Sequence, residues 1–283
     1  MAGSDAGDWR ALNRANWDER VAIHLRAPMY DLSDLRAGRG RLEAIEEAEL
    51  GGVAGERIAH LQCHFGADTL RLAQKGADVV GLDFSAPAIA EARRLAGELG
   101  LAARFVCADV YDAAAAIPQP HGFDRVFVSW GALCWLPDVA GWARVVASLL
   151  RPGGRLYLAE GHPSAWVFDD DAGDGPRPGW FAPYFERGPL VLDDPRDYAD
   201  PEARLANART HQFQHTMADV IGAVLGAGLS LDWLHEHDGV PWRMFACLEQ
   251  GPDRLWRFPD RPWLPLSFSL SATRRCERPP ACG

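Results

Sequence analysis

Three polar residues stand where consecutive apolar segments end. Asp83 closes ADVVGLD, Asp109 closes ARFVCAD and Ser129 closes FDRVFVS. In an open parallel sheet, ligands bind at the carboxyl ends of the strands, so carboxylates there can accept protons from ribose hydroxyls or from an adenine amino group. A hydrogen bond to a charged group contributes roughly 1.5–3 kcal/mol. Any one of these residues alone could be a turn or helix cap, but three in register favour a nucleoside site.

The stretch HLQCHFGADTL, residues 60–70, lies where an α/β nucleotide-binding protein carries its glycine-rich loop. Only Gly66 of the expected glycines is present. Residues 62–67 therefore lack the G-x-G-x-x-G pattern that a nicotinamide oxidoreductase needs. Two hypotheses remain for this loop: a modified version that still binds a nucleoside cofactor, or a degraded relic.

The numbers and positions of lysine and cysteine residues exclude further classes of enzyme and metal site. Of the 29 basic residues only Lys75 is a lysine, and Gly76 follows it, so no Walker-type G-K-[ST] exists. The Tyr-x-x-x-Lys pair of short-chain dehydrogenases is missing too. The six cysteines form no C-x-x-C pair. The HEH sequence at 235–237 offers two histidines on one strand face without a third ligand, so we expect no metal site.

Net charge and hydropathy limit the classes of binding partner that the chain can have. The formal net charge is −10 and there is no basic stripe, which argues against nucleic acid and anionic membrane surfaces as partners. The start of the chain, MAGSDAGDWR, lacks the basic and apolar regions of a signal peptide, and no apolar run is long enough to span a membrane. We therefore expect a cytoplasmic protein.

The elements that position these residues follow from the apolar pattern. From about residue 58 to residue 160, short apolar segments alternate with helical stretches, which predicts a doubly wound α/β fold with a parallel sheet buried on both faces. One or two amphipathic helices are expected before it, over residues 8–50, in the segments WRALNRANWDERVAIHL and LRAGRGRLEAIEEAEL. A long loop-like insertion, rich in Pro, Asp and aromatic residues, follows the fifth strand.

Four segments together carry a resemblance. VVGLDFS, FVCADVYD, FDRVFVSWGALCWLPD and LLRPGGRLYLAEGHP resemble successive motifs of class I S-adenosylmethionine-dependent methyltransferases, and the likeness covers roughly residues 10–275. It implies a Rossmann-like, mostly parallel seven-stranded sheet with a reversed last strand, PLSFSLSAT, and S-adenosylmethionine as cofactor. One domain is then expected, with these parts: an N-terminal helical cap (1–50), a cofactor-binding core (51–161), an acceptor-covering insertion (162–210), a C-terminal helix and strands (211–275) and a tail (276–283).

The resemblance also implies roles for the residues at the strand ends. Asp83 would bind the ribose of the cofactor, and Phe84 would pack on its adenine. Asp109 with Val110 would hold the adenine edge, and the backbone at Ser129 would contact the methionine portion.

Aligned to the family's loop, His60 stands at the acidic position, Gln62 and His64 replace two glycines, and Gly66 is retained. We expect a working loop in which Gln62 and His64 adopt φ/ψ values open to non-glycine residues and use their side chains. His64 is then the better partner for the cofactor's carboxylate, which Tyr30 could also reach with its hydroxyl.

The aromatic residues after the strand ends and in the insertion fit an apolar acceptor pocket: Trp130, Trp135, Trp166, Trp180, Phe181, Tyr184 and Phe185. His162, directly after the fifth strand, and His215 are candidate bases, although a lone histidine is more often structural. The predicted function is methyl transfer to a small-molecule acceptor, apolar or aromatic. The alternative is a non-catalytic nucleoside-binding or regulatory protein with a degenerate loop.

Overall fold

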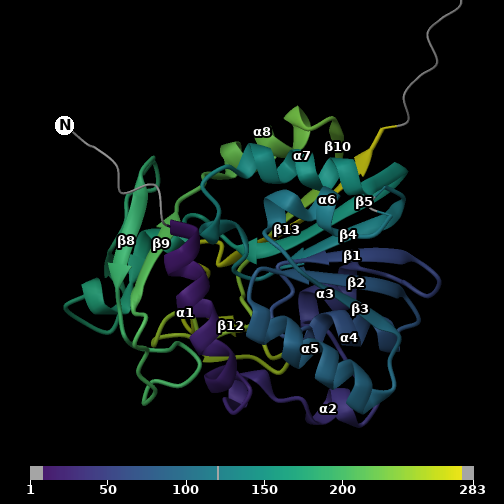
Figure 1. Cartoon of the computed structure of the whole chain (residues 1–283). Coiled ribbons are helices and arrows are strands. Elements are labelled where there is room, and N and C mark those ends of the chain that lie inside the picture. Colours follow the sequence, from purple (N-terminus) through teal and green to yellow (C-terminus); the bar gives the residue numbers. More distant parts are fainter. Residues whose placement is uncertain (1–8, 120, 276–283) are drawn as a thin grey trace, which may run out of the picture.

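Seven strands form one sheet in the order β10-β13-β5-β4-β1-β2-β3 (Figure 1). The computed structural model describes residues 9–119 and 121–275, so the expected tail, 276–283, lies outside the described residues. Strand pairs are parallel except those of β13, which runs antiparallel to β5 and β10. The predicted mostly parallel sheet with a reversed last strand is thus confirmed. The strands are β1 (Arg57–Leu61), β2 (Asp78–Asp83), β3 (Ala103–Cys107), β4 (Phe123–Ser129), β5 (Leu150–Gly161), β10 (Leu229–His237) and β13 (Ser267–Arg274).

Helices cover both faces of this sheet, as a doubly wound fold requires. One face packs on α6, α7 and α8, and the other on α4 and α5. Strand β1 shows the alternation: Ala59 and Leu61 belong to the first core, and Ile58 belongs to the second. The helical elements are α4 (Ala67–Gln74), α5 (Ala86–Leu99), η2 (Val110–Asp112), α6 (Ala113–Ala116), η3 (Leu133–Trp135), α7 (Val139–Leu149) and α8 (Met217–Gly226).

The N-terminal region differs in part from the prediction. The first expected helix is confirmed, but the second is wrong as a single helix, because the chain breaks within RAGRGRLE. Gly38 has a φ of 71°, in the left-handed region, and the N–H of Gly40 donates to the side chain of Gln74 rather than to a helical carbonyl. The elements are α1 (Trp9–His24), η1 (Pro28–Tyr30), α2 (Ser33–Arg36) and α3 (Ala44–Glu49).

The insertion after β5 contains more regular structure than its composition suggested. Two antiparallel pairs, β6–β7 and β8–β9, lie in the chain between β5 and α8. A second long connection, between β10 and β13, carries the pair β11–β12 and was not predicted. The elements are η4 (Ala165–Val167), β6 (Phe168–Asp169), η5 (Asp170–Ala172), β7 (Gly179–Trp180), β8 (Pro189–Asp193), β9 (Arg209–Phe213), β11 (Glu249–Gln250) and β12 (Trp256–Arg257).

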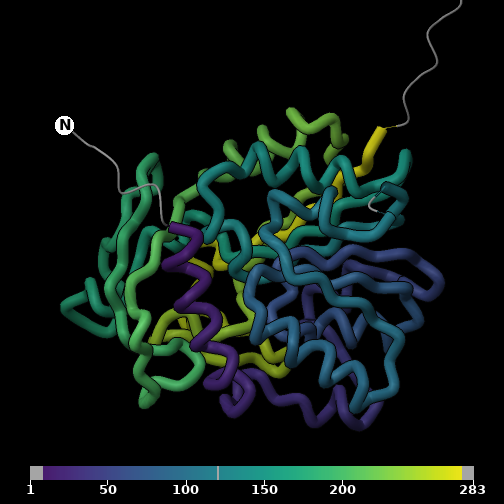
Figure 2. The backbone as a smooth tube through the Cα atoms, viewed as in Figure 1, coloured from purple at the N-terminus to yellow at the C-terminus, as the bar shows by residue number. Residues whose placement is uncertain are grey.

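Helix α1 joins the insertion to the sheet domain. It contacts β9 on one side and α5 on the other, and Figure 1 shows it as the purple helix between the β8–β9 pair and α5. The tube in Figure 2 shows the same arrangement, with the purple α1 lying between the green insertion and the blue strands and helices. This position brings the polar face of α1 to the carboxyl ends of β1, β2 and β3.

Candidate active site

Asp83, at the end of β2, links two loops of the site. Its Oδ2 accepts a hydrogen bond from the N–H of His64 (2.8 Å) and its Oδ1 accepts one from the N–H of Ser85 (2.9 Å). The side chain is nearly buried, and burial raises the pKa of Asp83 to about 6, against the lowering effect of these amide bonds. Ser85 caps α5, and its hydroxyl donates to Asp18 of α1 (2.5 Å).

Asp109, after β3, is the N-cap of η2. Its Oδ1 accepts from the N–H of Tyr111 (2.9 Å), and its Oδ2 lies 2.8 Å from Nε of Arg10 on α1. Val110 is buried in the core below it. Phe84, after β2, is partly buried, and the guanidinium of Arg14 lies 5.8 Å from its ring centroid. The expected adenosine-side residues therefore gather under α1, although their predicted contacts with a cofactor stay predictions.

The loop after β1 has left-handed backbone at the two residues that replace glycines, Gln62 and His64. Gln62 and His64 have φ values of 55° and 51°, inside the narrow left-handed region that L-residues can adopt, at roughly 1–2 kcal/mol each. Side-chain contacts accompany both: Nε2 of Gln62 donates to the carbonyl of Ala132 (2.8 Å), and Nε2 of His64 lies 2.8 Å from Nδ1 of His24. The expected use of side chains in this loop agrees with these contacts.

Gly66 is explained by packing alone. Its φ is 78°, and a Cβ at this position would stand 2.6 Å from the ring of Phe105 and 2.9 Å from the Cβ of Ala92. No side chain fits between α4, β3 and α5 there. The predicted contact of Gly66 with a cofactor stays a prediction.

His60 occupies the family's acidic position as a structural residue. It is buried in β1, and its Nδ1 lies 2.8 Å from the hydroxyl of Thr69. Burial lowers its pKa to about 4, so the ring is neutral at neutral pH and carries no charge into the loop.

The loop after β4 depends on a carboxylate that was not singled out in the sequence. Glu160, buried near the end of β5, accepts from the N–H groups of Gly131 (2.8 Å), Ala132 (2.5 Å) and Leu133 (2.8 Å). Burial raises the pKa of Glu160, while these amides lower it. An acidic residue in the otherwise apolar strand RLYLAEG was the signal that could have identified it.

The backbone at Ser129, the last residue of β4, continues into this loop. Trp130 follows with a φ of 46°, and its N–H donates to the carbonyl of Ala159 (2.8 Å). The indole N–H of Trp130 donates to Glu46 of α3 (2.7 Å). Together with the bond from Gln62 to Ala132, this contact links the loops after β1 and β4 to each other and to α3.

Helix α1 and the insertion close over the β1 loop. Trp17 lies edge-on to His64 and to Trp135, with ring centroids 5.3 Å apart in both pairs. Tyr30 stacks on His24 at 4.6 Å, and its hydroxyl bonds that of Tyr198 from the insertion. Tyr30 thus lies beside the loop, as predicted, but among the described residues its hydroxyl meets a second tyrosine.

The two candidate bases, His162 and His215, are held by protein groups. Nδ1 of His162 accepts from the N–H of Ser164 (3.1 Å), and its Nε2 lies 3.0 Å from Glu236, a contact without hydrogen-bond geometry. Nε2 of His215 donates to the carbonyl of Leu136 (2.7 Å). Within residues 9–119 and 121–275, neither imidazole ring contacts His64. The catalytic roles of His162 and His215 stay predictions.

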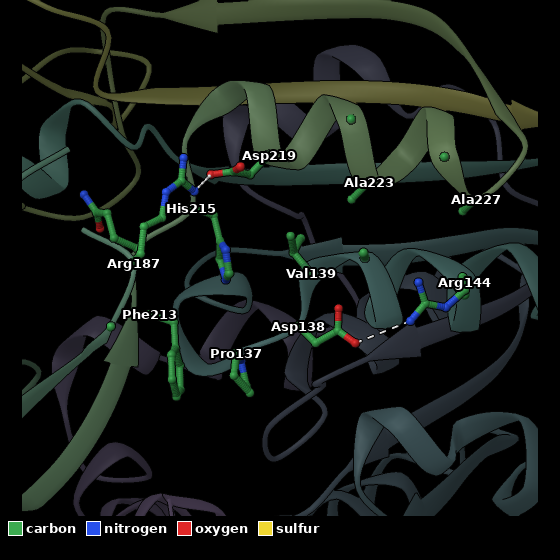
Figure 3. A pocket seen from close by; sticks show the side chains of 15 residues that line it. Pro137, Asp138, Val139, Arg144, Arg187, Phe213, His215, Asp219, Ala223 and Ala227 are labelled. Carbon is green, nitrogen blue, oxygen red and sulfur yellow. Dashed lines mark hydrogen bonds and ion pairs between the residues drawn. The ribbon is translucent and has the colours of Figure 1, made fainter. Parts of the chain in front are cut away.

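Two cavities lie in the described part of the chain, and neither is lined by Asp83. Figure 3 shows the first, about 450 Å³, between α7 and α8, with His215 and the Arg187–Asp219 ion pair (2.6 Å) on its wall. The second, about 490 Å³, is apolar and belongs to the insertion, lined by Ser164, Val167, Phe168, Trp180, Phe181, Ala182, Pro183 and Tyr184. Of the seven aromatic residues expected at an acceptor pocket, Trp180, Phe181 and Tyr184 line this cavity, and the other four do not. That the cavity takes an acceptor stays a prediction.

Within the ranges that the structure describes, no group of three or more His, Cys, Asp and Glu residues is placed to hold a metal ion. The same residues include no helix that is both long and apolar enough to cross a bilayer.

Comparison with known proteins finds similarity to methyltransferases. A model described as a methyltransferase domain matches residues 58–154. The chain is 37% identical over 146 residues to a demethylmenaquinone methyltransferase of Beutenbergia cavernae, which covers 50% of this chain and 57% of that protein. It is 28% identical over 167 residues to a ubiquinone biosynthesis O-methyltransferase of Pseudomonas aeruginosa, covering 58% and 66%. The chain thus spans less than two thirds of these relatives' length.

Solved structures share the fold over most of the chain. An S-adenosylmethionine-dependent methyltransferase from Mesorhizobium loti aligns with a TM-score of 0.55 at 24% identity, covering 81% of this chain and 97% of that one. A magnesium protoporphyrin IX methyltransferase from Synechocystis, with bound S-adenosylhomocysteine, aligns with a TM-score of 0.56 at 16% identity, covering 93% and 98%.

Proposed function

We propose that this chain, which belongs to the class I S-adenosylmethionine-dependent methyltransferase family, transfers a methyl group from S-adenosylmethionine to a small-molecule acceptor. The observation that carries the proposal is Asp83. A nearly buried carboxylate ends β2, receives the amides of the neighbouring loops and lies beneath α1, where it can accept the two ribose hydroxyls.

The reaction would be an in-line displacement at the sulfonium. The acceptor forms a bond to the methyl carbon as the bond from sulfur to that carbon breaks, and the neutral thioether leaves as S-adenosylhomocysteine. The protein's main contribution is then alignment and exclusion of water. Where the acceptor loses a proton, His162 and His215 remain the candidate bases, and glutamine at either position should lower turnover without weakening S-adenosylhomocysteine binding.

An apolar or aromatic acceptor is favoured by two observations. The insertion cavity is lined by aromatic and aliphatic side chains. Two relatives have names that refer to quinones, demethylmenaquinone and ubiquinone. We also propose that the enzyme works in the cytoplasm and without a nucleic acid partner, as the acidic composition favours.

The insertion, 162–210, is proposed to cover the acceptor site. It reaches the β1 loop through Asp197 and Tyr198, which contact His24 and Tyr30. Hydrogen exchange should slow across 166–186 when cofactor product and acceptor are added together. Equal protection of free and bound protein would contradict a covering role.

The direct test is turnover. The protein is incubated with S-adenosylmethionine carrying a labelled methyl group and a panel of hydroquinones and phenols with apolar tails. Label should move into the acceptor, with one S-adenosylhomocysteine formed per methyl transferred. Stoichiometric S-adenosylhomocysteine binding without turnover across the panel would favour the non-catalytic alternative, and absence of binding would overturn the proposal.

A further inference from the structure

A chain of polar contacts joins the insertion to the β1 loop. Oδ2 of Asp197, between β8 and β9, lies 3.1 Å from Nε2 of His24 on α1. Nδ1 of the same histidine lies 2.8 Å from Nε2 of His64. Asp197 is 2% exposed and His24 is 0% exposed, so their polar atoms need hydrogen-bond partners within the protein.

The carboxylate fixes the direction of every bond in this chain. Asp197 accepts from the N–H groups of Ala199 (2.8 Å) and Asp200 (3.2 Å) at Oδ1, and from Arg20 (2.8 Å) at Oδ2. Burial alone would raise the pKa of Asp197, but His24, the Ala199 amide and the Arg20 charge hold it below its usual value, so the group is ionised and only accepts.

The tautomers of both rings follow. His24 must carry its proton on Nε2, facing Asp197, which leaves its Nδ1 bare. That bare nitrogen accepts from Nε2 of His64, which leaves Nδ1 of His64 bare in turn. Burial lowers the pKa of both His24 and His64, so no second proton reverses this order at neutral pH.

The free end of the chain lies in the candidate cofactor site. The His64 ring is flanked by Trp17, Tyr30 and Phe65, and its backbone N–H is bonded to Asp83. Within residues 9–119 and 121–275, Nε2 of His64 bonds His24 and its Nδ1 makes no hydrogen bond. The loop therefore presents Nδ1 of His64 as an acceptor whose polarity His24 sets, and Oε1 of Gln62 is a second acceptor of this loop without a partner in these residues.

We propose, on the basis of the proposed function, that Nδ1 of His64 accepts a hydrogen bond from the α-ammonium group of S-adenosylmethionine, and that Asp197, through His24, is the positioning residue that sets this polarity. An ammonium group only donates and a carboxylate only accepts, so a bare ring nitrogen suits the first and repels the second. This reverses the expectation that His64 meets the cofactor's carboxylate. It also couples the insertion to cofactor recognition.

The first test needs no ligand. Long-range nitrogen–proton NMR of the wild-type histidine side chains reports which ring nitrogen carries the proton, with His64→Gln and His24→Gln used for assignment. Protons on Nε2 of both rings are expected. A proton on Nδ1 of His64 would overturn the proposal, even if Asp197 variants do not fold.

The second test reverses the direction of the hydrogen bonds from Asp197 through His24 to His64. In Asp197→Asn the amide oxygen can keep the contacts with Ala199 and Asp200, while its NH2 donates to His24 and forces the opposite tautomers. S-adenosylhomocysteine should bind about tenfold more weakly, since a charge-assisted bond is lost. 5′-Methylthioadenosine, which lacks the ammonium group, should bind within about twofold of its wild-type affinity.

Arg20→Met is the matched control, because it removes the same ion pair without reversing the tautomers, and it should keep the wild-type preference for S-adenosylhomocysteine. Equal weakening of both ligands in Asp197→Asn, or no change in either, would overturn the proposal. Wild-type protein that binds neither ligand would instead reject the proposed function.

Discussion

At the ends of β2 and β3 the polar contacts come from carboxylates that receive backbone N–H groups, Asp83 and Asp109. At the ends of β1 and β4 they come with left-handed backbone at non-glycine residues, Gln62, His64 and Trp130. The first side is the one assigned to adenosine and the second is the one assigned to the methionine portion. The two sides meet at the hydrogen bond from the N–H of His64 to Asp83.

The difference shows what a glycine in such a loop is for. Gly66 cannot be replaced because β3 and α5 leave no space for a Cβ. Gln62 and His64 need only a left-handed φ, which costs roughly 1–2 kcal/mol and can be offset by side-chain hydrogen bonds that a glycine lacks. Loss of the glycine pattern is therefore compatible with a working loop.

The largest expected effect tests whether the β4 side also relies on a carboxylate. Glu160→Gln places an NH2 group against backbone donors in a buried position, so the free energy of unfolding should fall by about 3 kcal/mol. Urea titration measures this. Glu249→Gln, an exposed change on β11, is the control. A loss of unfolding free energy no larger than that of the control would mean that the loop after β4 does not depend on Glu160.

Asp83→Ala should weaken cofactor binding on both sides, because the Asp83 carboxylate accepts the hydrogen bond that joins them. S-adenosylhomocysteine affinity is expected to fall at least about tenfold, as 1.4 kcal/mol is a factor of ten and a charge-assisted bond contributes at least that much. Calorimetry gives the affinity and circular dichroism checks the fold. Unchanged affinity in a folded variant would remove Asp83 from the site.

Acid should weaken the adenosine side. Burial raises the pKa of Asp83 from its usual 3.8 to about 6, so the ionised form that accepts ribose protons is lost as pH falls through that value. The effect of Asp83 on the free energy of unfolding has the opposite sign: because the folded-state pKa is raised, the stabilising contribution is complete below pH 3.8 and is lost as pH rises through about 6. S-adenosylhomocysteine affinity should rise about tenfold between about pH 5 and pH 7, and less in Asp83→Asn.

The smallest effect concerns the methionine side alone. His64→Gly relieves a left-handed side chain but removes the ring that faces His24, so stability should change by less than about 1 kcal/mol. S-adenosylhomocysteine should bind about fivefold more weakly, because the acceptor is gone and the loop gains freedom. Tighter binding by the glycine variant would identify the loop as a relic.

The sequence predicted what depends on local pattern. Apolar segments located the parallel strands, and the rule that ligands bind at strand ends identified Asp83 and Asp109. It did not predict the bond between His24 and Asp197, which are 173 residues apart, because that bond exists only once the insertion packs on α1. Glu160 was detectable as an acidic residue within a strand, but its role was not, because its partners are backbone amides in the loop of a neighbouring strand.

A crystal structure of the complex with S-adenosylhomocysteine tests the central claim most directly. The ribose hydroxyls should lie on the carboxylate of Asp83, and the α-ammonium group should lie within hydrogen-bonding distance of Nδ1 of His64, beneath α1. Adenosine bound elsewhere, for example in the cavity between α7 and α8, or a methionyl carboxylate facing His64, would contradict this account.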